Sequence, residues 1–172
     1  MNTTTTTDAK AFFYIDGIPT KGCWVDLDSE TTWEDIAEAI KQKYPAADCD
    51  EILCADAEGL AEEFLSAYDS FELKTFSEFV GAVELSHLDP EIIAAYCSNN
   101  GEWTPEGVQN AEECYCGTFD SDEAFADDLA DQIGLLDTIP SNIAAYFDFS
   151  RWANDLLMSD YFVSEGHYFR NV

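Results

Sequence analysis

Short runs of β-forming residues near the start of the chain predict a small sheet. Residues 11–17 and 22–27 are rich in aromatic and β-branched side chains, and they flank a Gly-Ile-Pro-Thr-Lys turn. Two such runs around a turn predict a β-hairpin. Residues 51–55 have the composition of another short strand, and this strand could join the hairpin in one sheet.

An amphipathic helix is predicted between the hairpin and that strand. Thr32 is a suitable N-cap, and Asp35 follows three positions later, as in a capping box. Pro45 marks the end of the helix. Between these signals, apolar residues recur at helical spacing and form one stripe, which consists of Trp33, Ile36, Ala37, Ile40 and Tyr44.

The middle of the chain is predicted to be mainly helical. Residues 64–71 have no clean period. Pro90 suits the first turn of a helix that ends near the Asn-Asn-Gly sequence at 99–101, and Pro105 begins a further one. Before them, residues 75–88 have a helical apolar face, which consists of Phe76, Phe79, Val80, Val83 and Leu88.

The clearest helical pattern spans residues 121–133. Asp120 with Glu123 resembles an acidic capping box, and Gly134 stands where a C-cap belongs. One side of this helix is apolar, with Phe125, Ala126, Leu129, Ala130 and Ile133. The other side has only carboxylates, at Glu123, Asp127, Asp128 and Asp131. Like charges at i,i+4 are mildly destabilising, and a solvated helix face usually mixes signs.

The last part of the chain completes an α+β pattern. A helix is predicted from about residue 149 to 157, and a hairpin from 161–163 and 167–169 around Glu165-Gly166. We therefore divide the chain into three small domains. They are an α+β domain at 1–60 with hairpin and helix, a mainly helical domain at 61–110, and an α+β domain at 111–172 with the acidic helix and the terminal hairpin.

Composition adds an extreme charge to this pattern. The chain has 36 acidic and 7 basic residues, a formal net charge of -29, and no lysine or arginine between Lys74 and Arg151. Such a charge destabilises a compact state through self-repulsion. With 47% hydrophobic and 14% aromatic residues, the chain nevertheless has ample material for a core, so we expect a folded protein with a highly acidic surface.

The charge also restricts the partners. An acidic surface repels nucleic acid and anionic membranes, and it attracts basic proteins. We therefore expect no direct binding of nucleic acid and no membrane contact. B-form DNA has one negative charge per roughly 1.7 Å of axis, so the 29 net charges correspond to about 49 Å of duplex. This arithmetic allows a protein that imitates DNA, but does not by itself establish one.

Residues suited to catalysis are scarce. The two histidines, His87 and His167, have no metal-binding spacing, and the chain has no nucleophile elbow and no glycine-rich phosphate loop. Cys114 and Cys116 are the closest cysteine pair, but no second pair completes four ligands, so core packing is favoured. We expect no catalytic residue, no metal and no cofactor. In short, the case for an enzyme is weak.

The cysteines and the start of the chain suggest the compartment. The six cysteines do not form a dense disulfide framework, and several lie among apolar residues, which favours reduced thiols. The chain does not open with a signal-peptide pattern, and no apolar run is long enough to span a membrane. The cytoplasm is therefore the expected location.

Three segments resemble the ArdA antirestriction proteins. Residues 22–27, GCWVDL, resemble the family's G-x-W-[IV]-D signature, and residues 115–126, YCGTFDSDEAFA, resemble its aromatic-x-Gly-x-[FW]-D-S-x-E-x-F-A stretch. The tail resembles the family's ending. Its matching pieces are Ile-Pro at 139–140, YFDF at 146–149, WANDL at 152–156 and GHYF at 166–169.

This resemblance implies a function without catalysis. ArdA proteins are DNA mimics, encoded largely on mobile genetic elements, that occupy the DNA-binding groove of type I restriction–modification enzymes. They are elongated, curved dimers of small domains strung end to end, with carboxylates in place of phosphates. The resemblance thus implies a homodimer. The residues we expect on the phosphate-mimicking surface are Glu112, Glu113, Asp120, Asp122, Glu123, Asp127, Asp128 and Asp131.

Three alternatives remain open at this stage. A halophilic protein would be equally acidic for solvation alone. An acidic interaction module could bind another basic DNA-binding protein, such as a nucleoid protein. A hydrolase or metal protein could use scattered carboxylates, and we rank this alternative last.

Overall fold

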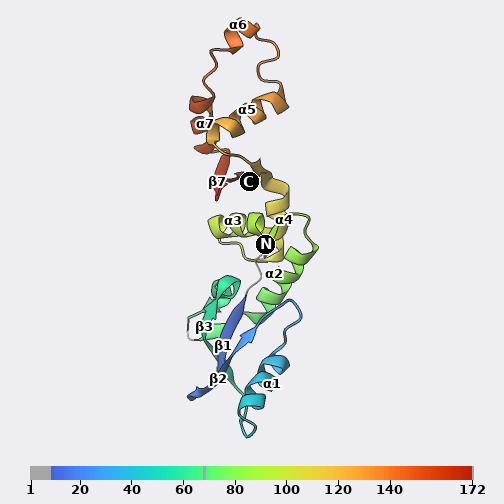
Figure 1. Cartoon of the computed structure of the whole chain (residues 1–172), viewed down its shortest axis with the longest axis vertical. Coiled ribbons are helices and arrows are strands. Elements are labelled where there is room, and N and C mark those ends of the chain that lie inside the picture. Colours follow the sequence, from blue (N-terminus) through green and yellow to red (C-terminus); the bar gives the residue numbers. More distant parts are fainter. Residues whose placement is uncertain (1–8, 68, 172) are drawn as a thin grey trace, which may run out of the picture.

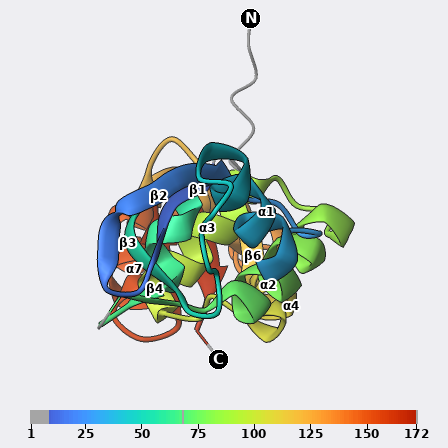
Figure 2. The ribbon, with the colours of Figure 1, turned by 90° about the horizontal axis from the view of Figure 1, so that it is seen from below.

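In the computed structural model, which describes residues 9–67 and 69–171, the elements follow one another along the longest axis nearly in chain order (Figure 1). The amino-terminal sheet and helix α1 lie at one end, and helices α5 to α7 lie at the other. Viewed along this axis, the elements overlap within one outline (Figure 2). Helices and strands are both present, so the predicted α+β class is confirmed.

The predicted sheet forms at the amino-terminal end. Strands β1 (Lys10–Ile15), β2 (Ile18–Asp26) and β3 (Ile52–Glu58) are antiparallel in the order β2-β1-β3, so the third strand joins the hairpin as expected. The hairpin turn is tighter than predicted. Ile15 pairs with Ile18, and Gly17 adopts a φ of 72°, a conformation that glycine reaches without the penalty of a Cβ.

Helix α1 (Trp33–Lys43) begins as the sequence predicts. The Asp35 amide donates to Thr32 Oγ1 at 3.2 Å, and the Thr32 amide donates to Asp35 Oδ2 at 2.9 Å, which completes the capping box. Ile36 and Ile40 of the predicted stripe are buried. Trp33, at the first position of the helix, is 40% exposed, so the stripe is not buried over its whole length.

Three helices form the middle of the molecule. A 3-10 turn η1 (Gly59–Phe64) and two very short strands, β4 (Leu65–Ser66) and β5 (Ser70–Phe71), precede helix α2 (Leu73–Leu85). Helix α2 ends three residues before the predicted limit, so Leu88 lies outside it. Helices α3 (Pro90–Asn100) and α4 (Pro105–Cys114) both start with the predicted proline.

The last part of the chain forms a second small sheet with two longer helices on it. Strands β6 (Tyr115–Thr118), β7 (Tyr161–Ser164) and β8 (His167–Arg170) are antiparallel in the order β6-β8-β7, which confirms the terminal hairpin. Helices α5 (Asp122–Ile133) and α7 (Phe149–Leu157) pack together, and the short helix α6 (Ser141–Ala144) lies beyond them along the long axis (Figure 1).

Of the two caps predicted for α5, the structure confirms the one at the carboxyl end. Ser121 is the N-cap and accepts from the Ala124 amide at 3.1 Å. The predicted capping box of Asp120 with Glu123 is therefore wrong, because the neighbouring serine takes the cap position. Gly134 closes the helix in the left-handed conformation, as predicted. Ile133, predicted on the apolar face, is 58% exposed because it lies at the very end of the helix.

The buried side chains of residues 9–67 and 69–171 form two clusters. The larger extends from the amino-terminal sheet through α2, α3 and α4, and the smaller lies between α5, α7 and β8. Strand β8 belongs to both, because successive strand residues point to opposite faces. Phe169 packs in the larger cluster and Tyr168 in the smaller.

Candidate protein-binding surface

Carboxylates dominate the surface of the described residues. Every described aspartate and glutamate is exposed except Glu112, which is partly buried. In this part of the chain, the ion pairs of lysine with carboxylates are Lys10 with Glu58, at 2.7 Å, and Lys74 with Glu78, at 3.6 Å. The negative charge is therefore displayed to solvent and is little compensated by the chain itself.

Helix α5 carries a row of three candidate residues. Glu123, Asp127 and Asp131 follow at i, i+4 and i+8 and are all exposed. A helix rises 1.5 Å per residue, so successive members lie about 6 Å apart along its axis. The opposite side of the helix is held by the buried Phe125 and Ala130. Packing thus fixes the helix while its carboxylates point away from the core.

The structure brings two further candidates together across a cleft. Glu113 at the end of α4 and Asp128 of α5 line the same cleft of about 280 Å³, together with Gln132 and Arg170. Gln132 Nε2 donates to Asp128 Oδ2 at 2.6 Å. Carboxylates from two helices therefore converge on one concave surface, an arrangement that sequence spacing alone does not reveal.

Glu112 has an internal role that the sequence did not indicate. Ser86 Oγ donates to Glu112 Oε1 at 2.5 Å, and His87 Nδ1 lies 3.1 Å from the same oxygen. The hydrogen bond from Ser86 is the main reason that the pKa of Glu112 is lowered. This carboxylate connects α4 to the end of α2.

Asp122 also makes an internal contact, and Asp120 lies close to it in sequence. Tyr168 donates its hydroxyl to Asp122 Oδ1 at 2.6 Å. Burial is the main reason that the pKa of Tyr168 is raised, and this hydrogen bond is the second. Asp120 lies just before the Ser121 cap and is exposed. Glu112 and Asp122 keep further lone pairs for a partner, since an ionised carboxylate offers about four acceptor sites.

The residues considered for catalysis or metal binding have structural surroundings. His167 Nδ1 lies 2.8 Å from Thr118 Oγ1. All six cysteines are free thiols; Cys114 is buried, and Cys116 is partly buried. Within the described ranges, no group of three or more histidine, cysteine or carboxylate side chains is arranged to hold a metal ion. None of the helices described is both long and apolar enough to cross a membrane.

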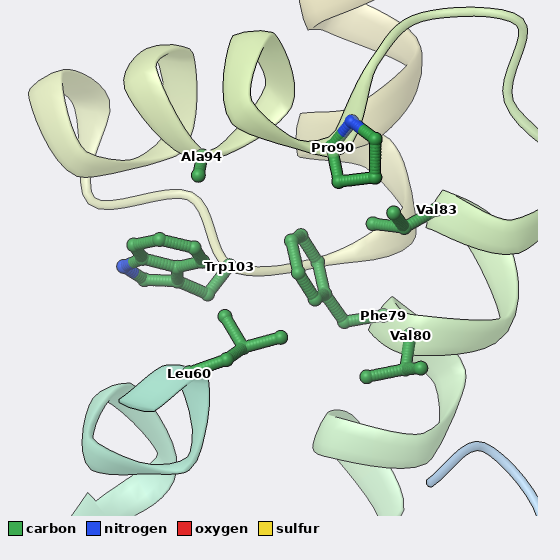
Figure 3. A pocket seen from close by; sticks show the side chains of 7 residues that line it. All are labelled: Leu60, Phe79, Val80, Val83, Pro90, Ala94 and Trp103. Atoms are coloured by element: carbon green, nitrogen blue, oxygen red, sulfur yellow. The ribbon is translucent and has the colours of Figure 1, made fainter. Parts of the chain in front are cut away.

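An apolar cavity between η1, α2 and α3 is too small for a ligand. Leu60, Phe79, Val83 and Trp103 are among its lining side chains (Figure 3), and its volume is about 20 Å³. That space is near the size of one water molecule, which needs two to four polar partners that these side chains do not offer. The cavity is a gap in core packing.

Sequence reasoning missed a cleft at the amino-terminal end. Trp33 lines it together with Glu34, Asp50 and Glu51. The helical stripe placed Trp33 in the core. Its position directly after the N-cap, at the edge of the stripe and beside an acidic residue, is the one local signal that could have indicated exposure.

Comparison with known protein families identifies a relationship over most of the chain. The family model described as "Antirestriction protein (ArdA)" matches residues 14–170. This range covers nearly the whole chain and includes all eight candidate residues. No curated protein matches the chain.

Proposed function

Because the chain belongs to the ArdA family of antirestriction proteins, we propose that it inhibits type I restriction–modification enzymes by occupying their DNA-binding groove as a mimic of B-form DNA. The observation that supports this mechanism is the exposure of all described carboxylates except Glu112, in a chain with a net charge of -29. The proposed action is binding in place of DNA and needs no chemical step.

The proposed binding is electrostatic and pre-organised. A groove that binds DNA presents lysine and arginine side chains, and it gains Coulomb energy and counterion release from a mimic as it does from phosphates. Helix α5 offers Glu123, Asp127 and Asp131 in a row on a helix capped at both ends, by Ser121 and Gly134. Carboxylates on a rigid helix lose little conformational entropy on binding.

The proposed assembly is a homodimer. Each chain would contribute three small units strung end to end, at 1–60, 61–110 and 111–172, and two chains would present about twice the 49 Å of duplex charge. The stacking of elements along one axis is consistent with this form (Figure 1). The expected location is the cytoplasm, where incoming DNA meets restriction enzymes.

The test is transfer of unmodified phage or plasmid DNA into cells that have an active type I restriction system. Expression of the protein should restore transfer, and the purified protein should block cleavage less effectively as salt concentration rises. No restoration by a folded, soluble protein would contradict the proposal. Isolation of a nucleoid or other basic protein with it, in place of a restriction enzyme, would favour the acidic interaction module.

A further inference from the structure

A cleft of about 460 Å³ lies between the start of α1 and strand β3, with an aromatic ring and acidic residues in its lining. None of the residues that line it is basic. Three of them have carboxylates, and the others are mainly apolar. The full lining consists of Trp33, Glu34, Ala37, Cys49, Asp50, Glu51 and Ile52.

The tryptophan is held in place by its neighbours. Trp33 follows the capping box of Thr32 with Asp35, which fixes the first turn of the helix. Its ring meets the ring of the fully buried Phe13 edge to face, with centroids 5.7 Å apart and an interplanar angle of 80°. The side chain still remains 40% exposed. The cleft therefore has a positioned aromatic surface that is open to solvent.

Elsewhere in this sheet, an indole ring and a carboxylate already hold a cationic side chain. Lys10 Nζ lies 5.4 Å from the centroid of the Trp24 ring and 2.7 Å from Glu58 Oε2. An indole face and a carboxylate together thus bind an ammonium group within the molecule. At Trp33 the indole and the carboxylates are again together, but the lining has no basic side chain of its own.

We propose that this cleft binds an arginine side chain of the protein partner, with the guanidinium group against the Trp33 ring and its N–H groups directed to Glu34 and Glu51. Arginine fits better than lysine, because its planar, weakly hydrated group stacks on aromatic rings and binds carboxylates with two N–H groups. The partial positive charge at the start of α1 opposes a cation, but Glu34 and Asp35 in the first turn offset it.

The proposal rests on the proposed function for the identity of the partner. Helix α1 and strand β3, which contribute residues to the cleft, lie towards the opposite end of the long axis from α5 (Figure 1). The cleft would therefore add a second, specific contact to a surface that otherwise acts through its total charge, and it would fix one end of the molecule on the bound enzyme.

The direct test uses N-acetyl-arginine amide as a probe and nuclear magnetic resonance of the full chain. We expect a saturable shift of the Trp33 indole N–H and of the backbone amides of Asp50 and Glu51. The double variant Glu34→Gln with Glu51→Gln should weaken probe binding about fivefold. Trp33→Leu should weaken it about two- to fivefold, and because this variant has no indole at position 33, its binding is measured from the backbone amide shifts. N-acetyl-lysine amide should bind more weakly.

The matched control removes the same charge elsewhere in this part of the molecule. Glu62→Gln with Glu63→Gln changes two exposed carboxylates of η1 that do not line the cleft, and it should leave probe binding unchanged. An equal loss in this control, no saturable shift in the wild-type chain, or equal binding of the lysine probe would each overturn the proposal.

A cleavage assay with a purified type I enzyme separates this proposal from the proposed function. If the wild-type protein gives no protection, the proposed function fails, while the probe experiment still decides whether the cleft binds a guanidinium group. If the wild-type protein protects DNA, Trp33→Leu should need two- to fivefold more protein for the same protection. Equal protection by a folded Trp33→Leu variant would overturn the role of the cleft in partner binding.

Discussion

Helices α1 and α5 have nearly equal lengths and are both capped at their amino ends, but they differ in the charges of their last turns. Helix α1 has Glu34 and Asp35 in its first turn and Lys41 and Lys43 in its last turn, so both ends complement the helix dipole. Helix α5 also has acidic residues in its first turn, but no basic residue in its last turn.

The charges of α1 stabilise their helix, whereas several charges of α5 do not. Asp131 lies near the negative end of the α5 dipole, and the i,i+4 neighbours in its row are all acidic. Each of these arrangements destabilises an isolated helix by a few tenths of a kcal/mol. The core contacts of α5 must therefore supply its stability, and we propose that its acidic face serves binding.

The largest expected effect comes from removing those core contacts. Phe125 stacks on Tyr168, with centroids 4.6 Å apart and an interplanar angle of 19°. Phe125→Ala should lower the free energy of unfolding by about 3–5 kcal/mol, measured by urea denaturation. Ile40→Ala, at a buried position of α1, is the matched variant, with an expected loss of about 2–5 kcal/mol. A loss below about 1 kcal/mol for Phe125→Ala would show that α5 does not depend on its core.

Neutralising the acidic face of α5 should separate function from stability. Replacing four of the exposed carboxylates of α5 by amides, at Glu123, Asp127, Asp128 and Asp131, should weaken inhibition of a type I enzyme at least about tenfold, since close charge pairs across an interface each contribute about 1.5 kcal/mol or more. Stability should rise by up to about 1 kcal/mol, because like-charge repulsion is relieved.

The control for this variant removes four exposed carboxylates at other places, at Glu62, Glu63, Asp160 and Glu165. Equal weakening of inhibition in both variants would show that total charge, and not the α5 face, determines binding. Unchanged inhibition in the α5 variant would remove this helix from the proposed surface.

A smaller effect on stability is expected when a charge near the carboxyl end of each helix is replaced by one of the opposite sign. Asp131→Lys places a cation near the carboxyl end of α5 and should stabilise the protein by about 0.3–1 kcal/mol. Lys41→Glu makes the reverse change in α1 and should destabilise it by a similar amount. Thermal denaturation at low ionic strength would measure both. Shifts of the same sign in the two variants would contradict the dipole argument.

The smallest effect concerns pH and the internal role of Glu112. Its pKa is lowered in the folded protein, chiefly by the hydrogen bond from Ser86. The stabilisation is therefore present above the usual glutamate pKa and is lost as pH falls through the lowered value. Glu112→Gln should make stability depend less steeply on pH in this acidic range, as measured by urea unfolding at several pH values. If the dependence of stability on acidic pH were the same in Glu112→Gln as in the wild-type protein, the contact with Ser86 would add no stability.

Local signals in the sequence predicted the elements well. The capping box at Thr32, the prolines at 90 and 105, and Gly134 act within a few residues, so their effect can be read without the rest of the fold. The cap of α5 was misplaced by one residue because Asp120 and Ser121 are both good caps. The choice between them depends on how the chain leaves β6.

Contacts between distant segments could not be predicted in this way. Nothing in the sequence places Ser86 beside Glu112, or Glu113 across a cleft from Asp128. The exposure of Trp33 has the same origin, because helical spacing indicates a face and not how much of it the sheet covers. The acidic character of the candidate surface was predictable from composition, whereas the hydrogen bonds that Glu112 and Asp122 make within the chain were not.

Strand β8 lies at the end of the chain but completes the packing of much earlier segments. Phe169 completes the packing around Tyr96, which precedes it by more than seventy positions, while Tyr168 packs against Phe125. Proteins generally fold from the amino end as they are synthesised. Here the helices α3 and α4 emerge from the ribosome long before the strand that covers them. During translation these two helices therefore expose the apolar surface that β8 covers in the folded protein, until that strand has been made.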